Sequence, residues 1–336
     1  MNVRGAAVQS GLAALGLVVA YTTWQREPER APGEVVVVDV NKSDVKSIRL
    51  DDGNGKTVEL ERRQDGRDEE PRVWLKLSAD AKAKPPKPAR EVPGNEGADR
   101  LWDKFGPLRA TRSLGVLKAD KLKELGLDAP KKKLQVTARG VTHTFDVGAS
   151  PYGVSDPYVK DEQDGRVYVL GGGVINDVDS AGTRLVDRNL HGFKPGDFDS
   201  VTISAGGKSK TLQAPQAENQ FAAKLVNPKT GKPDDMAKNW HDKVWRMMVT
   251  DVLGKGEAPA GGTPEIACKV EYTWKGKPKG FVELGRLTPP PVASNVSAPP
   301  AGAVEAWARS ERTASWDKLP ANADDVIKEC SKVVGE

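Results

Sequence analysis

The chain is poor in the side chains that bind metals or act as nucleophiles. It has only two cysteines, Cys268 and Cys330, and three histidines among 336 residues. Two cysteines exclude a disulfide framework, and two interpretations stay open: one bridge in an oxidising compartment, or two buried thiols. His143, His191 and His241 have no partner ligand at the spacing of a zinc site. We therefore expect no catalytic residue, no metal site and no cofactor.

The sequence also lacks an excess of charge of either sign. Its 51 basic and 47 acidic side chains leave a net charge of +4, whereas nucleic-acid-binding proteins usually concentrate basic residues on one face. Residues 148–151 read GASP and do not complete a G-x-S-x-G elbow. Gly171-Gly172-Gly173 matches neither a dinucleotide fingerprint nor a P-loop, so a tight turn is favoured over a phosphate site. We expect no nucleic-acid partner.

One long apolar run stands out at the N-terminus. Met1–Arg4 is basic, and the 20 residues Gly5–Trp24 carry no charge. About 20 residues in a helix span a ~30 Å hydrocarbon core, and Arg4 favours an N-in orientation. We predict a transmembrane signal anchor over residues 1–24, which binds membrane lipid and crosses the cytoplasmic (inner) membrane once. The bulk of the chain would then lie in the periplasm or outside. The alternative is a cleaved signal peptide with Val18-Val19-Ala20 as its cleavage site.

Behind this run the chain is a series of short alternating segments separated by turns. Residues 25–40 comprise a charged, proline-bearing juxtamembrane tether and a first strand at Val35–Val40. The remaining pattern predicts an α+β fold of antiparallel meanders and hairpins with packed helices. Because the order of elements occurs twice, we predict two tandem β-rich repeats, over residues 41–192 and 193–336.

The first repeat is predicted to begin with a three-stranded meander at Val45–Leu50, Thr57–Arg62 and Val73–Leu77. Asp51-Asp52-Gly53-Asn54-Gly55 is interpreted as a hairpin turn, because its ligand spacing is wrong for calcium. Ala79–Gly97 is rich in Pro, Lys and Ala and is predicted to be a solvated loop. The apolar face of a following helix, ended by Gly106-Pro107, is indicated by Ala98, Leu101, Trp102 and Phe105.

The stretch Lys121–Pro130, KLKELGLDAP, predicts a short helix that stops at Gly126 and releases the chain into a strand. A hairpin is expected over Lys133–Gly148, with Arg139-Gly140 at its turn. Two further strands, Pro157–Lys160 and Arg166–Leu170, flank Asp164-Gly165. A helix is then expected to run from the triple glycine through Asn189.

In the second repeat, strands are predicted at Ser200–Ser204, Lys210–Gln213, Phe221–Val226, Glu265–Trp274, Gly280–Leu284, Val304–Arg309 and Ala314–Leu319. Thr288–Gly302 is a proline-rich loop. Asp234-Asp235 should cap a long helix whose apolar stripe extends from Ala237 to Val252. Core packing is favoured over a partner surface for this stripe, and His241 is assigned to its solvated face. A final helix is expected at Ala323–Val334.

Several of these segments resemble a bacterial family known only as a domain of unknown function. The resemblance covers Val45–Ile203 and rests on KLKELGLDAP, THTFDVG, PYVKDEQDGRVYVL and VDRNLHGFKPGDFDSVTI. It implies an N-terminal membrane helix and a genetic association with auxiliary components of gliding-type ABC transporters. Where the family usually has a more basic Arg-Asp-Arg-like patch, this chain has Val186-Asp187-Arg188. No catalytic residues are implied.

Together these observations predict a non-enzymatic, membrane-anchored envelope protein. Its role would be that of an accessory or scaffold subunit of an ABC-type transport or surface machinery, and its partners would be transporter or envelope assembly subunits. The alternative is an exported hydrolase, or a peptide- or glycan-binding module, with a cleaved signal peptide. The sequence does not indicate which surface would carry the interaction.

Overall fold

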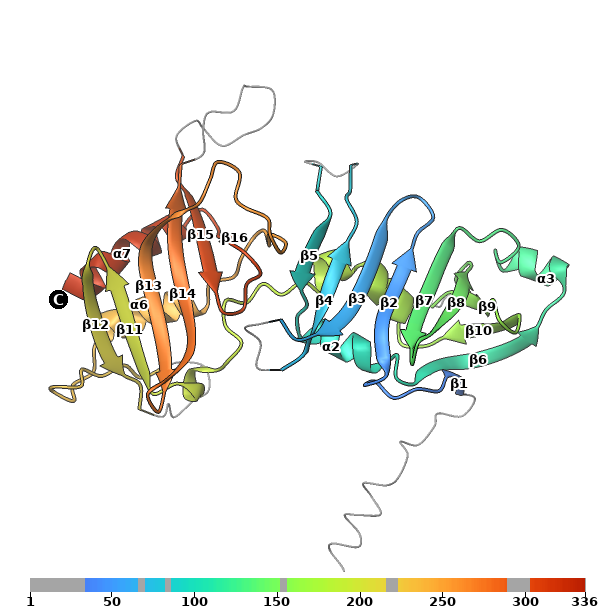
Figure 1. Cartoon of the computed structure of the whole chain (residues 1–336), viewed down its shortest axis with the longest axis horizontal. Helices are drawn as coiled ribbons and strands as arrows, with labels where there is room; N and C mark the ends of the chain where they lie inside the picture. The colour runs from blue at the N-terminus through green and yellow to red at the C-terminus, as the bar shows by residue number, and fades with distance from the viewer. Residues whose placement is uncertain are drawn as a thin grey trace, which may run out of the picture.

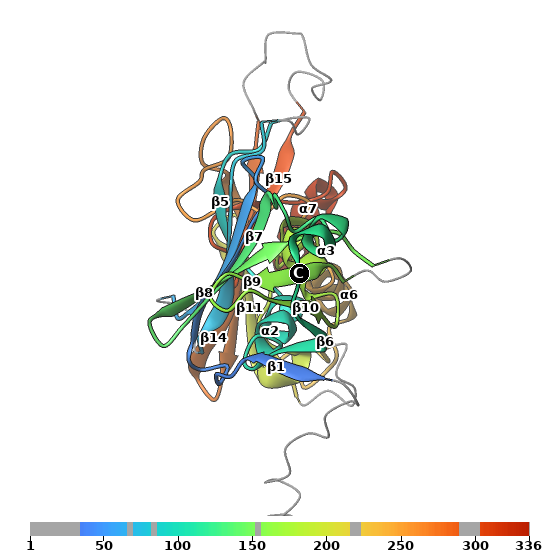
Figure 2. The same cartoon turned by 90° about the vertical axis from the view of Figure 1, so that its right-hand side faces the viewer.

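The computed structural model describes residues 34–65, 70–81, 86–151, 156–215, 223–288 and 303–335. These residues form two antiparallel sheets that lie side by side, with helices packed against them (Figure 1). The predicted mixture of antiparallel strands and packed helices is therefore confirmed. In Figure 2, which shows the molecule from the side, helices α2 (Glu96–Asp103), α6 (Asp235–Trp245) and α7 (Ala323–Gly335) lie to the right of strands β5 (Arg90–Pro93) and β14 (Lys277–Leu287).

The first sheet has ten strands in the order β1-β6-β10-β9-β8-β7-β2-β3-β4-β5. Besides β5, its strands are β1 (Val35–Val38), β2 (Val45–Asp51), β3 (Thr57–Arg63), β4 (Arg72–Leu77), β6 (Leu108–Val116), β7 (Lys132–Ala138), β8 (Val141–Val147), β9 (Tyr158–Asp161) and β10 (Arg166–Leu170). The alternation predicted for β2 is real: Ile48 and Leu50 are buried, whereas Lys46 is exposed. This period of two puts one face of the sheet in the core.

The second sheet has six strands in the order β12-β11-β13-β14-β15-β16. Besides β14, its strands are β11 (Ser200–Ala205), β12 (Lys208–Gln213), β13 (Glu265–Trp274), β15 (Glu305–Ser310) and β16 (Asp317–Lys318). Its order corresponds, strand by strand, to the run β3-β2-β7-β8-β9-β10 of the first sheet. The helices follow the same correspondence: α2 and α6 precede β7 and β13, while α4 (Val174–Asp179) and α7 follow β10 and β16.

The short helix of the KLKELGLDAP stretch is α3 (Ala119–Glu124), and the predicted stop is confirmed. Gly126 has φ 68°, a left-handed conformation that glycine adopts without strain. The amide of Leu127 then donates to the carbonyl of Leu122, and β7 begins at Lys132. A helical turn therefore delivers the chain directly into the centre of the first sheet.

Two loop and strand predictions are wrong. Within Ala79–Gly97, strand β5 pairs with β4 and α2 begins at Glu96, because Val92 finds a buried place beside Leu75. The strand predicted at Phe221–Val226 falls partly outside the described residues. Of its described part, only Val226 pairs, in isolated bridges with Gln213 of the edge strand β12 and with Pro233.

Two predicted helices end early. Helix α6 ends at Trp245 instead of continuing to Val252, because the following residues pair as extended backbone, and Met248 is 56% exposed. The helix expected through Asn189 consists of α4 and α5 (Ala181–Arg184), after which the chain pairs with residues near β5. In both cases tertiary pairing overrides a helical sequence pattern.

Within the residues that the structure describes, no helix is long and apolar enough to cross a membrane. The anchor predicted at residues 1–24 and most of the tether lie outside those residues, as does nearly all of the Thr288–Gly302 loop. The anchor therefore stays a prediction.

Candidate functional site

Residues 248–257, here called the junction segment, connect the facing edges of the two sheets. On one side the amide of Thr250 donates to the carbonyl of Lys318 in β16 (2.7 Å), and the amide of Lys318 donates to the carbonyl of Asp251 (2.9 Å). On the other side the amide of Lys255 donates to the carbonyl of Glu91 in β5 (2.8 Å). Backbone pairing therefore links both edge strands through one short segment.

Arg90 reinforces this connection with charge. Its Nη1 donates to Asp251 (2.7 Å) and to the carbonyl of Val252 (3.0 Å), and its Nε lies 3.0 Å from Glu257. Burial by itself lowers the pKa of Arg90, but Asp251 and Glu257 outweigh it and raise the pKa above its ordinary value. Since the Arg90 side chain is only 16% exposed, loss of either partner would leave a largely desolvated charge.

A second ion pair crosses the same junction. Asp187, which is 3% exposed, accepts from Nε of Arg312 (2.5 Å), and the carbonyl of Arg312 accepts from Nη2 of Arg72 in β4 (3.0 Å). Asp187 and Arg188 belong to the segment in which the family resemblance implied a basic patch. The sequence did not indicate that this segment would lie at a junction between two sheets.

Beside the junction segment lies a cleft of about 540 Å³. Its floor is the inner face of β3, β4 and β5, through Val58, Leu77 and Val92. Its helical wall contains Asn176, Asp179, Ser180, Gly182 and Thr183 from α4 and α5. Its far wall contains Val186, Arg188, Asp251 and Val252, and the charged residues Lys56, Asp80, Lys87 and Arg90 complete the rim. We take this cleft as the candidate functional site, because small-molecule sites concentrate at junctions between structural units.

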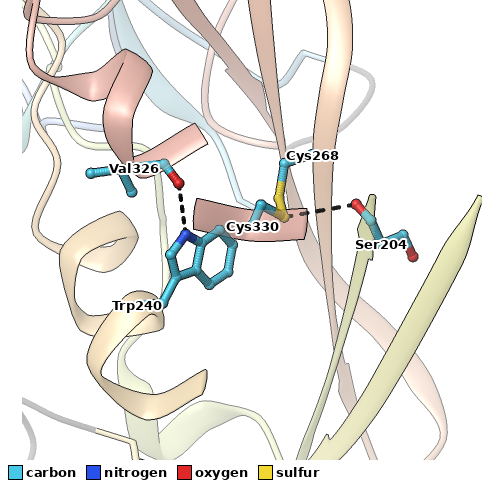
Figure 3. Close-up of a disulfide and its surroundings, with 5 residues drawn as sticks. All are labelled: Ser204, Trp240, Cys268, Val326 and Cys330. Carbon is cyan, nitrogen blue, oxygen red and sulfur yellow. Dashed lines mark hydrogen bonds between the residues drawn. A yellow bond between two sulfur atoms is a disulfide. The ribbon is translucent and has the colours of Figure 1, made fainter. Parts of the chain in front are cut away.

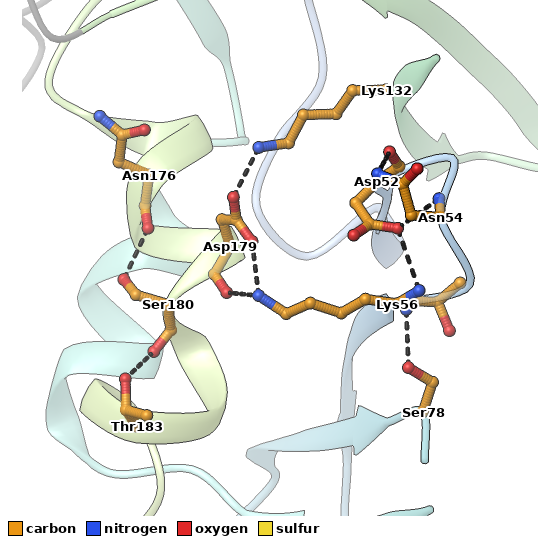
Figure 4. Close-up of polar contacts among 10 residues, drawn as sticks. Asp52, Asn54, Lys56, Ser78, Lys132, Asn176, Asp179, Ser180 and Thr183 are labelled. Atoms are coloured by element: carbon orange, nitrogen blue, oxygen red, sulfur yellow. Dashed lines mark hydrogen bonds and ion pairs between the residues drawn. The ribbon is translucent and has the colours of Figure 1, made fainter. Parts of the chain in front are cut away.

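Asp179 fastens the helical wall to the sheet (Figure 4). Lys56 Nζ lies 2.6 Å from its Oδ1 and 2.8 Å from its backbone carbonyl, and Lys132 Nζ lies 2.6 Å from its Oδ2. Burial raises the pKa of Asp179, but Lys132 and Lys56 outweigh it and hold the pKa below its ordinary value. The carboxylate is thus ionised and engaged, which suits a structural tie better than an acid catalyst.

The turn predicted at residues 51–55 positions Lys56. Asp51 accepts from the amide of Gly53. Asp52 accepts from the amides of Asn54 and Lys56 at 2.7 and 3.0 Å (Figure 4). Both carboxylates therefore accept hydrogen bonds from amides of the turn itself, which confirms the hairpin interpretation. In the described part of the chain, no group of His, Cys, Asp and Glu is arranged to hold a metal ion.

The helical wall contains two hydroxyl groups that already donate hydrogen bonds to backbone carbonyls. Ser180 Oγ donates to the carbonyl of Asn176 (2.6 Å), and Thr183 Oγ1 donates to the carbonyl of Ser180 (2.9 Å), as Figure 4 shows. Gly182 packs against Leu77 of the floor, where an added Cβ would lie 3.3 Å from a Leu77 methyl carbon. At the start of α4, the amide of Gly173 donates to Asp156 (2.7 Å), so the triple glycine forms a turn that a carboxylate caps.

The two cysteines form a disulfide, Cys268–Cys330, which ties α7 to β13 (Figure 3). Nearby, Trp240 Nε1 donates to the carbonyl of Val326 (2.8 Å), which joins α6 to α7. Because β13 and α7 correspond in order to β7 and α4, the disulfide occupies the place that the Lys132–Asp179 ion pair has beside the first sheet. In both sheets, the helix that follows the strands is therefore fixed to the corresponding strand.

The histidines lie away from the cleft. The assignment of His241 to a solvated helix face is wrong: it is 1% exposed, and its Nε2 lies 3.1 Å from the hydroxyl of Tyr272. Both sides of α6 are covered, since Trp240 faces α7 and His241 faces β13. Burial and the nearby His191 lower the pKa of His241 to about 3, and His191 stacks on Trp245 with ring centroids 4.1 Å apart. His143 lies in β8, half-buried.

Asp317 lies where β16 meets the junction segment. It is 2% exposed and accepts from the amide of Leu253 (3.0 Å). Burial raises its pKa to about 8 and outweighs the lowering effect of the Leu253 amide; Asp251 and Asp187 raise the pKa further, and Arg188 lowers it. No sequence pattern singles out this residue, because its environment is assembled from three distant segments.

The comparisons with known proteins give one match. Residues 98–262 match a domain of unknown function, DUF4340. The matched region includes Lys132, Asp179, Arg188 and the junction segment, but neither Lys56 nor Arg90. It begins and ends later than the predicted extent of the resemblance, Val45–Ile203, and nothing links it to ABC transporters or gliding. No curated protein and no solved structure matches the chain.

Proposed function

We propose that this protein is a non-enzymatic accessory or scaffold subunit of the cell envelope, which serves an ABC-type transport or surface machinery. Residues 1–24 would anchor it in the cytoplasmic membrane by a single pass, and both sheets would lie in the periplasm or outside. In this proposal the chain holds partner subunits in a fixed arrangement.

The observation that carries this proposal is the junction segment. A scaffold needs surfaces whose relative orientation is fixed, and here the two edge strands share one hydrogen-bonded segment. The Arg90–Asp251 and Asp187–Arg312 pairs reinforce it from the side chains. Separate domains usually move relative to one another unless their interface is extensive. The backbone hydrogen bonds and ion pairs of the junction therefore support one continuous platform.

We further propose that the platform arose from two tandem repeats. The shared strand order and the shared position of the helix tether support it. The first repeat would have added β4 and β5 on one side and β1 and β6 on the other. The Cys268–Cys330 disulfide supports export, because such bonds persist in oxidising compartments.

Affinity purification of the full-length protein tests the accessory role. The protein would be cross-linked in cells, extracted in mild detergent and compared with an unrelated single-pass protein that carries the same tag. We expect transporter or envelope assembly subunits to be recovered specifically. Recovery of the same background as the control, with the protein monomeric, would contradict the proposal.

The cleft favours a second candidate function, a binding module of the envelope, which requires no membrane anchor. An exported form would lack its first residues after cleavage near Val18-Val19-Ala20. Mass spectrometry of the mature N-terminus distinguishes the two, since an intact anchor is expected from the first proposal and a chain beginning near Tyr21 from the second.

A further inference from the structure

We propose that the cleft binds an amphipathic anion: a small molecule with an apolar chain or ring and a carboxylate or phosphate group. The inference goes beyond the accessory role and does not depend on it, because it concerns the cleft between α4–α5, the β3–β4–β5 floor and the junction segment.

Size and lining define the first half of this proposal. A cleft of about 540 Å³ lies within the range of about 300–1,000 Å³ that accommodates small ligands. Leu77 is half-buried in the floor and Pro88 is exposed at the rim, whereas Val58, Val92 and Val252 are only 3%, 1% and 4% exposed. An apolar group would therefore gain mainly by displacing water from Leu77 and Pro88.

The charges of the rim define the second half. Asp179 is occupied by Lys56 and Lys132, and Asp251 by Arg90. Asp80, the remaining carboxylate of the rim, is engaged as well. These pairs leave little unbalanced charge at either end of the cleft.

Two further cations line the cleft without a carboxylate partner among the described residues. Lys87 forms no ion pair with any described residue. Arg188 donates only to the carbonyls of Val249 (3.3 Å) and Thr250 (2.8 Å). Carbonyl acceptors orient a guanidinium but do not neutralise it.

The hydrogen-bonding capacity of the cleft also favours an anion. Ser180 and Thr183 have already donated their hydroxyl protons to backbone carbonyls. The charged donors of the cleft that have no carboxylate partner among the described residues are those of Lys87 and Arg188, and these side chains have no acceptor atoms. Their complement is a ligand that brings acceptor oxygens and negative charge, namely a carboxylate or phosphate.

Calorimetric titration with hexyl phosphate tests the proposal. The full-length protein would be held in nanodiscs of zwitterionic lipid, with empty nanodiscs as the blank. Inorganic phosphate would serve as the anion without a chain, and hexanol as the chain without an anion. We expect hexyl phosphate to bind at least ten times more tightly than either. Equal binding of inorganic phosphate or hexanol, or no binding of hexyl phosphate, would overturn the proposal.

Two variants locate the binding. Lys87→Gln is expected to lower the affinity for hexyl phosphate about threefold to tenfold, and Arg188→Gln about tenfold or more. Each variant removes a charge-assisted contact. Lys118→Gln and Arg112→Gln are matched controls, since both residues are exposed and lie outside the cleft. Lys87 is itself exposed, so its variant should fold even if Arg188→Gln disturbs the junction. Equal affinities in Lys87→Gln and Lys118→Gln would refute the assignment to this cleft.

A further arm distinguishes a lipid headgroup from a soluble anion. If the natural ligand is a lipid, phosphatidylglycerol in the nanodiscs should compete with hexyl phosphate and lower its apparent affinity. Lys87→Gln should abolish that competition. If it is soluble, the affinity should be the same in both lipids. The readout is ligand affinity, so a negative result leaves the test of the accessory role, which is partner recovery, unaffected.

Discussion

Replacing Asp317 by asparagine is expected to remove a loss of stability that the wild-type protein suffers between pH 6 and pH 8. The folded-state pKa of this carboxyl is about 8, against an ordinary value of 3.8. Between these values the folded protein retains a proton that the unfolded chain has released. Stability is therefore fully present below about pH 4, and it falls as the pH rises towards 8.

The size of the effect follows from the same two pKa values. One pKa unit corresponds to about 1.4 kcal/mol, and the dependence flattens near pH 8, where the folded carboxyl itself ionises. From pH 6 to pH 8 the contribution of Asp317 to the free energy of unfolding should thus fall by about 2 kcal/mol. The side-chain amide introduced by Asp317→Asn would still accept from the Leu253 amide but would carry no titrating group.

Urea unfolding, followed by tryptophan fluorescence at several pH values, measures this difference. We expect Asp317→Asn to gain about 2 kcal/mol over wild type on moving from pH 6 to pH 8. Asp120→Asn, at an exposed position in α3, is the matched control and should follow wild type. Other groups that titrate in this range are common to all three proteins and cancel. The same pH slope in Asp317→Asn and in wild type would refute the environment that the structure assigns to this carboxyl.

Three further predictions concern the junction and the second unit. Arg90→Gln should leave Asp251 without its partner and loosen the junction, so limited proteolysis should cleave within residues 248–257 faster than in wild type, while Arg112→Gln should not change the rate. Because burial lowers the pKa of His241 to about 3, its ring resonances should stay those of a neutral imidazole down to pH 5. The stability linked to this histidine should be present above about pH 6.5 and lost as the pH falls towards 3; ring titration near pH 6.5 would contradict this. Replacing Cys268 and Cys330 by alanine should cost about 2–4 kcal/mol of unfolding free energy, since their bond closes a loop with a sequence separation of 62, and an unchanged urea midpoint would contradict it.

Each sheet has a helix attached to one of its strands, but the two attachments differ chemically. In the second unit a covalent bond holds α7 to β13, and in the first unit Asp179 holds α4 to β7 through Lys132. An ion pair of partly exposed groups contributes only about 1 kcal/mol and weakens with salt. The Lys132–Asp179 pair therefore contributes less to stability than the disulfide, although Lys56 also binds Asp179.

The sequence by itself determined the local elements of this protein. The turn at residues 51–55, the stop at Gly126 and the hairpin over β7 and β8 were predicted from neighbouring residues and confirmed. Such features depend on backbone preferences and on side chains a few positions apart, which a single chain displays directly.

The tertiary structure alone decided the junction and the cleft. Arg90 and Asp251 are 161 positions apart, and Lys56 and Asp179 are 123 positions apart, so no spacing in the sequence relates them. The same long-range pairing ended α6 at Trp245, because the residues beyond it gain more from pairing with β16 and β5 than from another helical turn. The candidate site is made of contacts between distant segments, and only folding brings these segments together.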